Sequence, residues 1–139
     1  MKQSRFLTYA LPREFFGMSI PIPIQSAYLR DYASRSKLNF HLPVTEVCFG
    51  DSYYSLSNLF RLIEDGDHFG AVSILCLPLA EIATLIKILN LLEGKSIHFH
   101  FPLEGFLGSN EKILEWRESF IMMRKQSNKS LNALRSEYL

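Results

Sequence analysis

Hydrophobic and polar positions follow two periods along this chain, and the most apolar short stretch lies near its middle. Residues 70–77 (GAVSILCL) form a continuous apolar run that starts at Gly70 and stops at Pro78. A run of this length between glycine and proline is typical of a strand buried on both faces, as in parallel sheets. Segments with helical periodicity flank it. The pattern therefore predicts a central strand in an α/β sheet.

Three further segments carry the pattern of strands. Residues 5–10 (RFLTYA) are rich in β-branched and aromatic side chains, and residues 96–101 (SIHFHF) alternate along a short run. Residues 38–42 form a shorter candidate that stops at Pro43. Together with the central run, these segments predict four strands.

Helical periodicity predicts a helix after each strand. The expected ranges are about 23–36, from Ser55 or Ser57 as the capping residue to Asp65, 79–93, and 110–126. Right-handed crossovers between alternating strands and helices form a sheet with helices on both faces. The sequence therefore predicts a three-layer α/β fold of flavodoxin-like topology, with a mostly parallel four-stranded sheet.

Length and composition predict one domain at residues 1–126, followed by a polar tail at 127–139. A chain of 139 residues that is 47% hydrophobic can bury a core without disulfides or structural metal. Cys48 and Cys76 lack the spacing of a metal site or a redox motif, which favours reduced thiols. No signal sequence and no apolar run of membrane-spanning length is apparent. We expect a cytoplasmic protein with no membrane partner.

The charge balance argues against a nucleic-acid partner. Fifteen basic and fourteen acidic side chains give a formal net charge of +1. Such a chain has no strong positive field to hold a polyanion.

Binding sites in α/β sheets lie outside the carboxyl ends of the parallel strands. The loops that follow the predicted strands are residues 11–19, 43–55, 77–79 and 102–108. No recognised catalytic signature occupies these loops. Their polar side chains with candidate chemistry are Arg13, Glu14, Glu46, Asp51, Ser52, Tyr53 and Glu104.

Arg13 and Glu46 are the candidates for catalysis, each with a structural alternative. The guanidinium of Arg13 could hold a phosphate or carboxylate with paired N–H donors, or it could form a surface salt bridge. The carboxylate of Glu46 could act as acid, base or acceptor for a sugar hydroxyl, or it could cap a helix. Ser52 and Tyr53 could donate to a ligand, although a serine near the start of a helix usually caps it. Glu104 is a further ligand-binding candidate.

The histidines give no clear metal site. His98 and His100 alternate along a predicted strand, so they share one face and could present two imidazoles. A metal site needs more ligands and supporting contacts, which favours partly buried histidines bonded to backbone or carboxylate. His41 and His68 belong to no pattern. We therefore predict neither a metal nor another cofactor.

The last predicted helix carries more apolar surface than a short sheet needs. Such a surplus favours a homo-oligomer formed through residues 110–126, or a helix that closes one face of the sheet. Its large hydrophobic residues are Trp116, Phe120, Ile121, Met122 and Met123.

Parts of the chain resemble the catalytic domain of serine recombinases, which implies a resolvase-like topology. The segments that carry this resemblance are residues 25–33, Glu46, the region of Ser52, residues 65–67 and residues 94–104. That family has a serine nucleophile and an arginine after the first strand and further arginines after the central strand. Here residues 9–13 are YALPR and residues 76–79 are CLPL, so recombinase chemistry is not expected.

A second set of residues resembles the sporadic carbohydrate cluster proteins, nearly from the start of the chain to about Trp116. Thr8 stands where a glycine is expected before Tyr9. This resemblance implies a bacterial protein encoded among genes for surface-polysaccharide sugars, with no assigned reaction. The residues that carry it are Arg13, 16–17, 20–21, Gln25, 30–32, 45–46, 52–53 and 94–99.

These observations lead to two functional hypotheses. In the first, the chain is an enzyme or enzyme-like protein of surface-carbohydrate biosynthesis that acts on a phosphorylated or nucleotide-linked sugar. Arg13 then holds the anion, Glu46 transfers a proton or binds a hydroxyl, and Gln25, Ser52, Tyr53 and Glu104 contact the ligand. In the second, the chain is a non-catalytic binding or assembly module with a degenerate recombinase-like fold.

Overall fold

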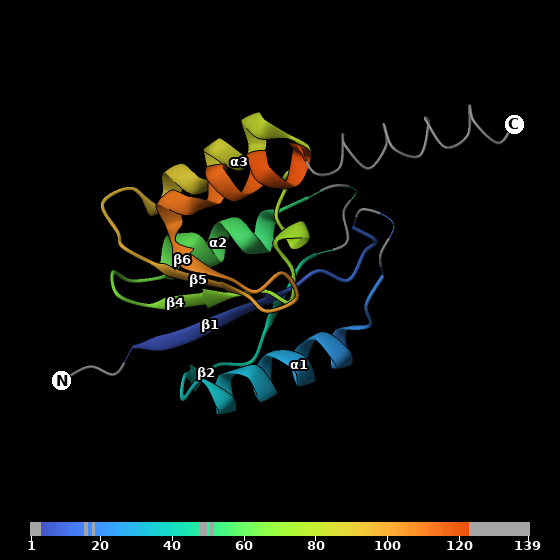
Figure 1. The fold of residues 1–139 in the computed structure, drawn as a ribbon, viewed down its shortest axis with the longest axis vertical. Helices are drawn as coiled ribbons and strands as arrows, with labels where there is room; N and C mark the ends of the chain where they lie inside the picture. Colours follow the sequence, from blue (N-terminus) through green and yellow to red (C-terminus); the bar gives the residue numbers. More distant parts are fainter. Residues whose placement is uncertain (1–3, 16, 18, 48–49, 51, 123–139) are drawn as a thin grey trace, which may run out of the picture.

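The chain folds around a mixed β-sheet with helices on both of its faces (Figure 1). The structure is a computed structural model, which describes residues 4–15, 17, 19–47, 50 and 52–122. The sheet has six strands in the order β2-β1-β4-β5-β6, and β3 also pairs with β1. The predicted α/β class is confirmed.

All strand pairs are parallel except the last. β2, β3 and β4 run parallel to β1, and β5 runs parallel to β4, whereas β6 is antiparallel to β5. The prediction of four strands omitted β3 and β6. The strand bounds are Arg5–Ala10 (β1), Asn39–Phe40 (β2), Val44–Thr45 (β3), His68–Gly70 (β4), His98–Phe101 (β5) and Phe106–Ser109 (β6).

The predicted strand at residues 38–42 is the first half of an interrupted edge. The backbone N–H of His41 donates to the carbonyl of Phe6, so pairing with β1 continues just past β2. Pro43 has no N–H to donate, and the ladder resumes only at β3. Past β3, the N–H of Glu46 donates to the carbonyl of Ala10 at 3.1 Å. The edge formed by β2 and β3 therefore follows β1 along its length and places Glu46 at the carboxyl end of β1.

The apolar run at residues 70–77 is buried, but the prediction that it forms a strand is wrong. β4 ends at Gly70, and the chain then turns into a short 3-10 helix, η1 (Ile74–Cys76). The hydroxyl of Ser73 accepts the N–H of Leu75 at 3.0 Å and caps this turn. An apolar run alone does not distinguish a buried strand from another buried segment. β4 nevertheless has the central place in the sheet.

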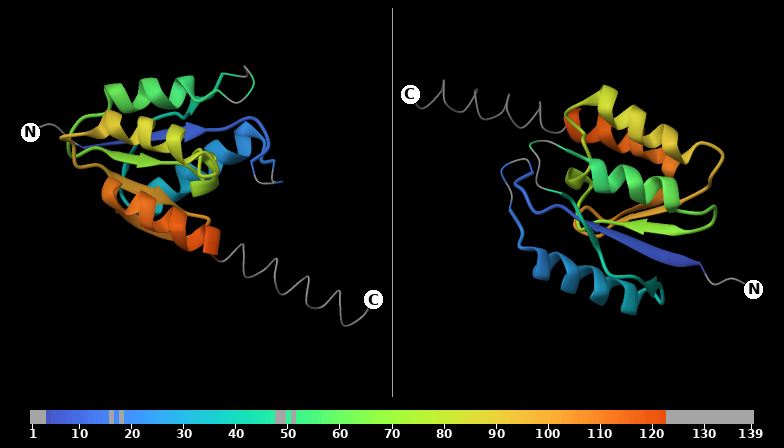
Figure 2. Two further views of the ribbon diagram at one scale, coloured as in Figure 1. Left: turned by 90° about the horizontal axis from the view of Figure 1, so that it is seen from above. Right: turned by 180° about the vertical axis from the view of Figure 1, so that it is seen from behind.

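The helices divide between the two faces of the sheet. α1 covers one face, while α2, α3 and the helix at residues 113–122 cover the other (Figures 1 and 2). Their bounds fall close to the predicted ranges, except that residues 79–81 precede α3 and its last turn tightens into η2. Positions 123–139, which include the predicted tail, lie outside the described residues. The bounds are Ile22–Arg35 (α1), Tyr54–Leu62 (α2), Ile82–Leu89 (α3), Asn90–Leu92 (η2), Asn110–Lys112 (η3) and 113–122.

None of the helices in the described part of the chain combines the length and apolar character needed to cross a membrane.

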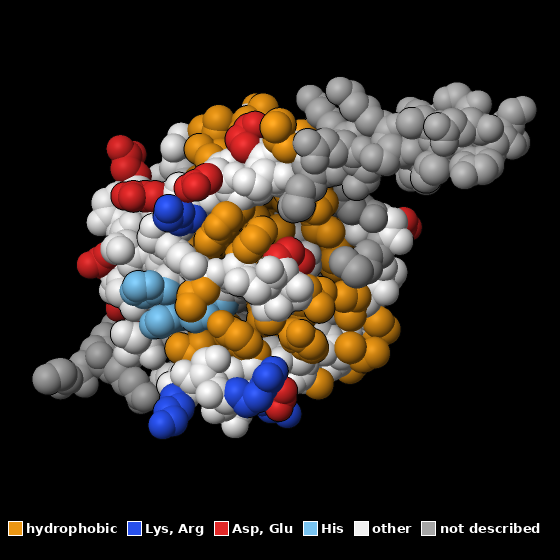
Figure 3. All heavy atoms as spheres, viewed as in Figure 1, with side chains coloured by type: hydrophobic (Ala, Val, Ile, Leu, Met, Phe, Trp, Pro, Cys, Tyr) orange, Lys and Arg blue, Asp and Glu red, His pale blue; other side chains and the backbone are white. Residues whose placement is uncertain are grey.

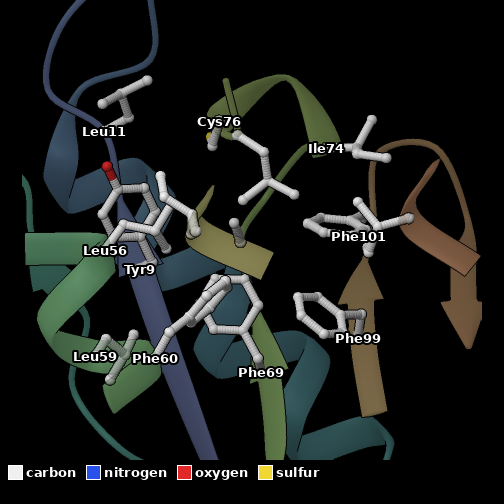
Figure 4. Close-up of a cluster of buried hydrophobic side chains, with 14 of the residues drawn as sticks. Tyr9, Leu11, Leu56, Leu59, Phe60, Phe69, Ile74, Cys76, Phe99 and Phe101 are labelled. Carbon is white, nitrogen blue, oxygen red and sulfur yellow. The ribbon is translucent and has the colours of Figure 1, made fainter. Parts of the chain in front are cut away.

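Strand alternation assigns different chemistry to the two faces of the sheet. Phe69 and Phe99 point toward α2, where Phe60 meets their rings edge-on at 5.0 and 5.9 Å between centroids (Figure 4). On the opposite face, Gly70 lies against the ring of Phe6, which a Cβ at this position would overlap. The face toward α2 is therefore an aromatic core, whereas the face toward α1 also carries histidines.

Candidate functional site

A cavity opens where the connections of the sheet change direction. From β1 the chain passes to β2 and β3 on one side, and it later returns to β4 on the other. Loops that leave the carboxyl ends of β1 and β4 thus diverge and leave a crevice, the usual ligand site in doubly wound sheets. The cavity has a volume of about 190 Å³. It is lined by Leu11, Arg13, Glu14, Phe15, Tyr53, Leu75 and residues 77–81.

Three of the four loops predicted to meet at this edge contribute to the cavity. They are the loops after β1, before α2 and after η1. Residues 102–108 instead form a turn and most of β6, and they contribute no lining residue. Asp51 lies outside the described residues.

Among the described residues that line this cavity, Arg13 supplies the only positive charge. Its Nη1 and Nη2 atoms are buried, and neither has a hydrogen-bond partner within the described ranges. The guanidinium carbon lies 4.7 Å from the centre of the Tyr53 ring, a cation–π arrangement. Buried N–H donors without partners are costly, so an acceptor brought by a ligand would be favourable here.

Gln25 holds the loop that carries Arg13. Its side-chain amide nitrogen donates to the carbonyls of Leu11 and Ile20, both at 2.8 Å. Its amide oxygen accepts the N–H of Leu11 at 3.2 Å. Gln25 is completely buried and lines no part of the cavity, so the predicted ligand-binding role does not agree with its position. It acts as a brace between α1 and the two ends of the loop.

Glu46 also lies outside the cavity, at the start of α2. One carboxylate oxygen accepts the Tyr9 hydroxyl at 2.8 Å and the N–H of Leu56 at 3.2 Å. The other accepts the N–H groups of Val47 at 3.0 Å and Ser55 at 2.9 Å. The residue is 2% exposed, and these four donors engage both oxygens. This geometry corresponds to the capping alternative, not to a group that meets a substrate.

The predicted caps of α2 are therefore incorrect. Ser55 lies inside the first turn, and Tyr53 occupies the N-cap position but its side chain does not cap the helix. Glu46 has the capping role instead, because its carboxylate accepts N–H groups of the first turn. Its negative charge also suits the positive end of the helix dipole. The hydroxyl of Ser52 accepts the N–H of Tyr54 at 3.1 Å, which adds a second local support.

The charges of Arg13 and Glu46 both change the pKa of the buried Tyr9 hydroxyl. Burial raises the pKa of Tyr9, the charge of Glu46 raises it further, and the charge of Arg13 lowers it. Figure 4 shows this hydroxyl at the Leu11 end of the core. Arg13 thus offsets part of the buried negative charge while its terminal nitrogens remain available.

Neither Cys76 nor Glu104 lines the cavity. Burial raises the pKa of the Cys76 thiol to about 12, so this thiol stays protonated and is a poor nucleophile. The Glu104 carboxylate accepts the Ser73 hydroxyl at 2.9 Å and the N–H of Ile74. Burial raises the pKa of Glu104, although these two hydrogen bonds act in the opposite direction. Glu104 therefore fastens η1 to the β5–β6 turn, and its predicted contact with a ligand does not agree with this position.

A second hollow, a groove of about 430 Å³, runs between α2 and α3. Ser52 and Tyr53, both predicted as ligand-binding residues, line it. Sequence reasoning missed Glu81 in the cavity and Arg61, Thr84 and Lys87 in the groove. The polar residues that follow Pro78 were the available signal for Glu81, whereas those on α2 and α3 look like ordinary exposed helix positions.

Three of the four histidines, His68, His98 and His100, form a separate cluster on the face toward α1. The Tyr32 hydroxyl lies 2.7 Å from Nδ1 of His100, and Nε2 of His100 lies 2.8 Å from Nδ1 of His68. The rings of His68 and His98 stack with centroids 4.8 Å apart. Histidine side chains gather accordingly on the face shown in Figure 3. The partners of His100 are a tyrosine and a histidine, where backbone or carboxylate was expected.

Burial lowers the pKa of His100, the charges that His68 and His98 would carry lower it in the same direction, and together they bring it to about 4. The pKa of His68 is also lowered, first by burial and then by His98. Among the residues that the structure describes, no group of three or more potential ligands is arranged to hold a metal ion.

The helix at residues 113–122 uses much of its apolar surface inside the molecule. The indole of Trp116 stacks on Phe106 at 5.1 Å between centroids and meets Phe101 edge-on. Leu114 and Met122 remain exposed, at 42% and 60%. The helix therefore covers the β5–β6 edge, and the predicted homo-oligomer remains a prediction.

A scan against protein-family models finds no match, and a search of curated proteins finds no significant match.

Proposed function

We propose that this chain is a cytoplasmic protein of surface-carbohydrate biosynthesis that binds a phosphorylated or nucleotide-linked sugar in the cavity around Arg13. The observation that carries the proposal is the pair of buried Arg13 nitrogens, which have no hydrogen-bond partner among the described residues and lie where the sheet connections change direction. If β2 and β3 are taken as one strand, the strand order supports the flavodoxin-like and resolvase-like topology expected from the sequence, with the difference that β6 is antiparallel to β5.

A phosphate group is the ligand chemistry that suits Arg13 best. The guanidinium presents parallel N–H donors that match two oxygens of a phosphate or carboxylate. The Tyr53 ring covers one face of the Arg13 guanidinium, which leaves the N–H groups at the edge of the guanidinium for the ligand. A charged acceptor would also complete donors that are otherwise unsatisfied in a buried position.

Glu14 and Glu81 favour a ligand that carries hydroxyl groups as well as an anion. Both residues line the cavity, and both are exposed. A purely anionic ligand would be repelled by them, whereas sugar hydroxyls could donate to them. One guanidinium beside two carboxylates therefore fits a sugar phosphate better than a free phosphate ion. The resemblance to sporadic carbohydrate cluster proteins points to the same class of ligand.

If the chain catalyses a reaction, the proton-transfer groups are Glu14 and Glu81, in place of Glu46. These two carboxylates are near a ligand held by Arg13, because they line the same cavity. A general acid or base must reach the proton that it moves. Glu46 is buried under α2 and already accepts four hydrogen bonds.

A non-catalytic binding or assembly module is the second candidate. The four hydrogen bonds that Glu46 accepts favour this second candidate, because they give this carboxylate a structural role. Leu114 and Met122 on the last described helix offer exposed apolar surface to a partner.

A thermal-shift screen tests the proposed function. The purified chain is heated with sugar phosphates, nucleotide sugars and the corresponding free sugars, since a ligand of the native state raises the apparent stability by mass action. We expect a stabilising hit that requires the phosphate and that Arg13→Ala abolishes. Arg35→Ala is the matched control, because Arg35 is exposed and bonded to Asp31 on α1. An unchanged hit in Arg13→Ala, or stabilisation by the free sugars alone, would contradict the proposal.

A further inference from the structure

We infer that the groove between α2 and α3 binds the nucleotide portion of the ligand, so that the chain takes a nucleoside-diphosphate sugar in preference to a simple sugar phosphate. This inference rests on the proposed function and selects one of the two ligand classes that it leaves open.

The groove and the Arg13 cavity form one continuous surface. Tyr53 lines both hollows. On the opposite wall, the hydroxyl of Thr84, a groove residue, donates to the carboxylate of Glu81, a cavity residue, at 3.2 Å. A ligand that leaves the cavity past Tyr53 therefore enters the groove without crossing a separate part of the surface.

The two hollows differ in charge. The cavity contains Glu14 and Glu81 beside Arg13. Among the described residues that line it, the groove has two basic side chains, those of Arg61 and Lys87, and no acidic one. The ammonium group of Lys87 makes no hydrogen bond or ion pair with the described residues, and the guanidinium of Arg61 bonds the side chain of Asn58 at 2.9 Å. The groove is therefore the part of the surface that suits a second negative charge.

The groove also has surfaces suited to a nucleoside. Ile88, which is 4% exposed, contributes to an apolar wall. The Tyr54 ring is 62% exposed at the start of α2 and can stack on a base. Hydroxyls of Ser57 and Thr84 line the same groove, within reach of polar groups on a ribose or base.

The order of these features matches the order of groups in a nucleotide sugar. Glu14 lies on the cavity side, whereas Arg13 with Tyr53 on one wall and Glu81 with Thr84 on the other lie at the junction. The basic and aromatic residues of the groove lie at the other end. A diphosphate placed at the junction would lie between the guanidinium of Arg13 and the cations of the groove, and it would direct the sugar into the cavity, past Glu81 and toward Glu14.

Isothermal titration calorimetry tests the inference with matched pairs of ligands. The probes are UDP-glucose, GDP-mannose and dTDP-glucose, each compared with the corresponding sugar 1-phosphate. We expect at least one nucleotide sugar to bind tenfold or more tightly than its sugar phosphate. The double variant Arg61→Ala/Lys87→Ala should remove this difference and leave the affinity for the sugar phosphate unchanged. Lys112→Ala is the control, because Lys112 is exposed outside both hollows and pairs with Glu115.

The possible failures of the two proposals are distinct. If sugar phosphates bind through Arg13 but no nucleotide sugar binds more tightly, or if the double variant keeps the tenfold difference, the groove inference is overturned and the proposed function stands. If nucleotide sugars bind equally well to Arg13→Ala but lose affinity in the double variant, the groove inference stands and the role proposed for Arg13 is overturned.

Discussion

The guanidinium of Arg13 lies over the ring of Tyr53, with 4.7 Å between the guanidinium carbon and the ring centroid. This contact joins the loop after β1 to the residue that precedes α2, so it fixes the junction between the cavity and the groove. A desolvated cation–π pair contributes on the order of 1–2 kcal/mol. The pair therefore restrains Arg13 in an orientation that leaves its terminal nitrogens available to a ligand.

Removal of the Tyr53 ring should weaken ligand binding more than it weakens the fold. We predict that Tyr53→Leu lowers the affinity for the phosphorylated ligand roughly tenfold, the equivalent of about 1.4 kcal/mol, because Arg13 loses its support. Tyr53→Phe keeps the ring and should bind within about threefold of the wild type. Calorimetry on both variants measures the difference. Equal affinities for Leu and Phe at this position would show that the ring does not orient Arg13.

Truncation of Glu46 should destabilise the fold without removing the ligand site. In Glu46→Ala, the Tyr9 hydroxyl and the N–H groups at the start of α2 lose a buried acceptor. We predict a loss of about 3 kcal/mol or more in the free energy of unfolding, measured with urea. Glu93→Ala, at an exposed position, is the control and should change stability by less than about 0.5 kcal/mol.

Ligand affinity decides between the two roles of Glu46. Under conditions in which Glu46→Ala remains folded, its affinity for the ligand should stay close to that of the wild type. Normal stability with lost binding or activity would instead establish the catalytic alternative.

The burial of His100 should make the fold sensitive to mild acid. Its pKa is lowered from 6.5 to about 4, so between these values the unfolded chain takes up a proton that the folded chain excludes. The contribution of His100 to the free energy of unfolding is therefore fully present above about pH 6.5. As the pH decreases toward 4, the free energy of unfolding falls by up to about 3 kcal/mol. Urea unfolding at several pH values should show this slope in the wild type and in the control His41→Gln. A slope of the same size in His100→Gln would assign the effect to other groups.

Gly70 should be intolerant of any side chain. A Cβ at this position would overlap the ring of Phe6, and the carbonyl of His100 lies close on another side. We predict that Gly70→Ala destabilises the protein by roughly 2 kcal/mol through overpacking. The second substitution Phe6→Leu makes room for the methyl group, so the two changes together should cost less than the sum of the single changes. Strict additivity would place the cause elsewhere.

Elements with local signals could be predicted from the sequence. β1 has the predicted bounds, and α1 starts within one residue of its predicted start at Pro23, because strand composition and helical period are local properties. The strand predicted at residues 70–77 does not form, because a side chain distant in the sequence accepts a backbone hydrogen bond from this run. Glu104, thirty residues from Ile74 along the chain, supplies the acceptor that lets this apolar segment leave the sheet.

The candidate site was predictable only as far as loop position allowed. Arg13 and Tyr53 follow or precede elements that the sequence locates, so their meeting at one edge of the sheet could be expected. The role of Glu46 depends on Tyr9, thirty-seven residues away, and that of Gln25 depends on the course of a loop. Hydrogen-bond partners at such separations leave no periodic pattern in the sequence. The groove was missed because two helices form it jointly.

The most direct test of the central claim is to observe the Arg13 guanidinium while a ligand binds. In ¹⁵N NMR spectra of the arginine side chains, the Arg13 signal can be assigned by its absence in Arg13→Lys. We predict that titration with the best ligand of the screen shifts this signal, with a midpoint equal to the dissociation constant from calorimetry, while the Arg35 signal stays in place. Saturating binding with an unmoved Arg13 signal would contradict the account.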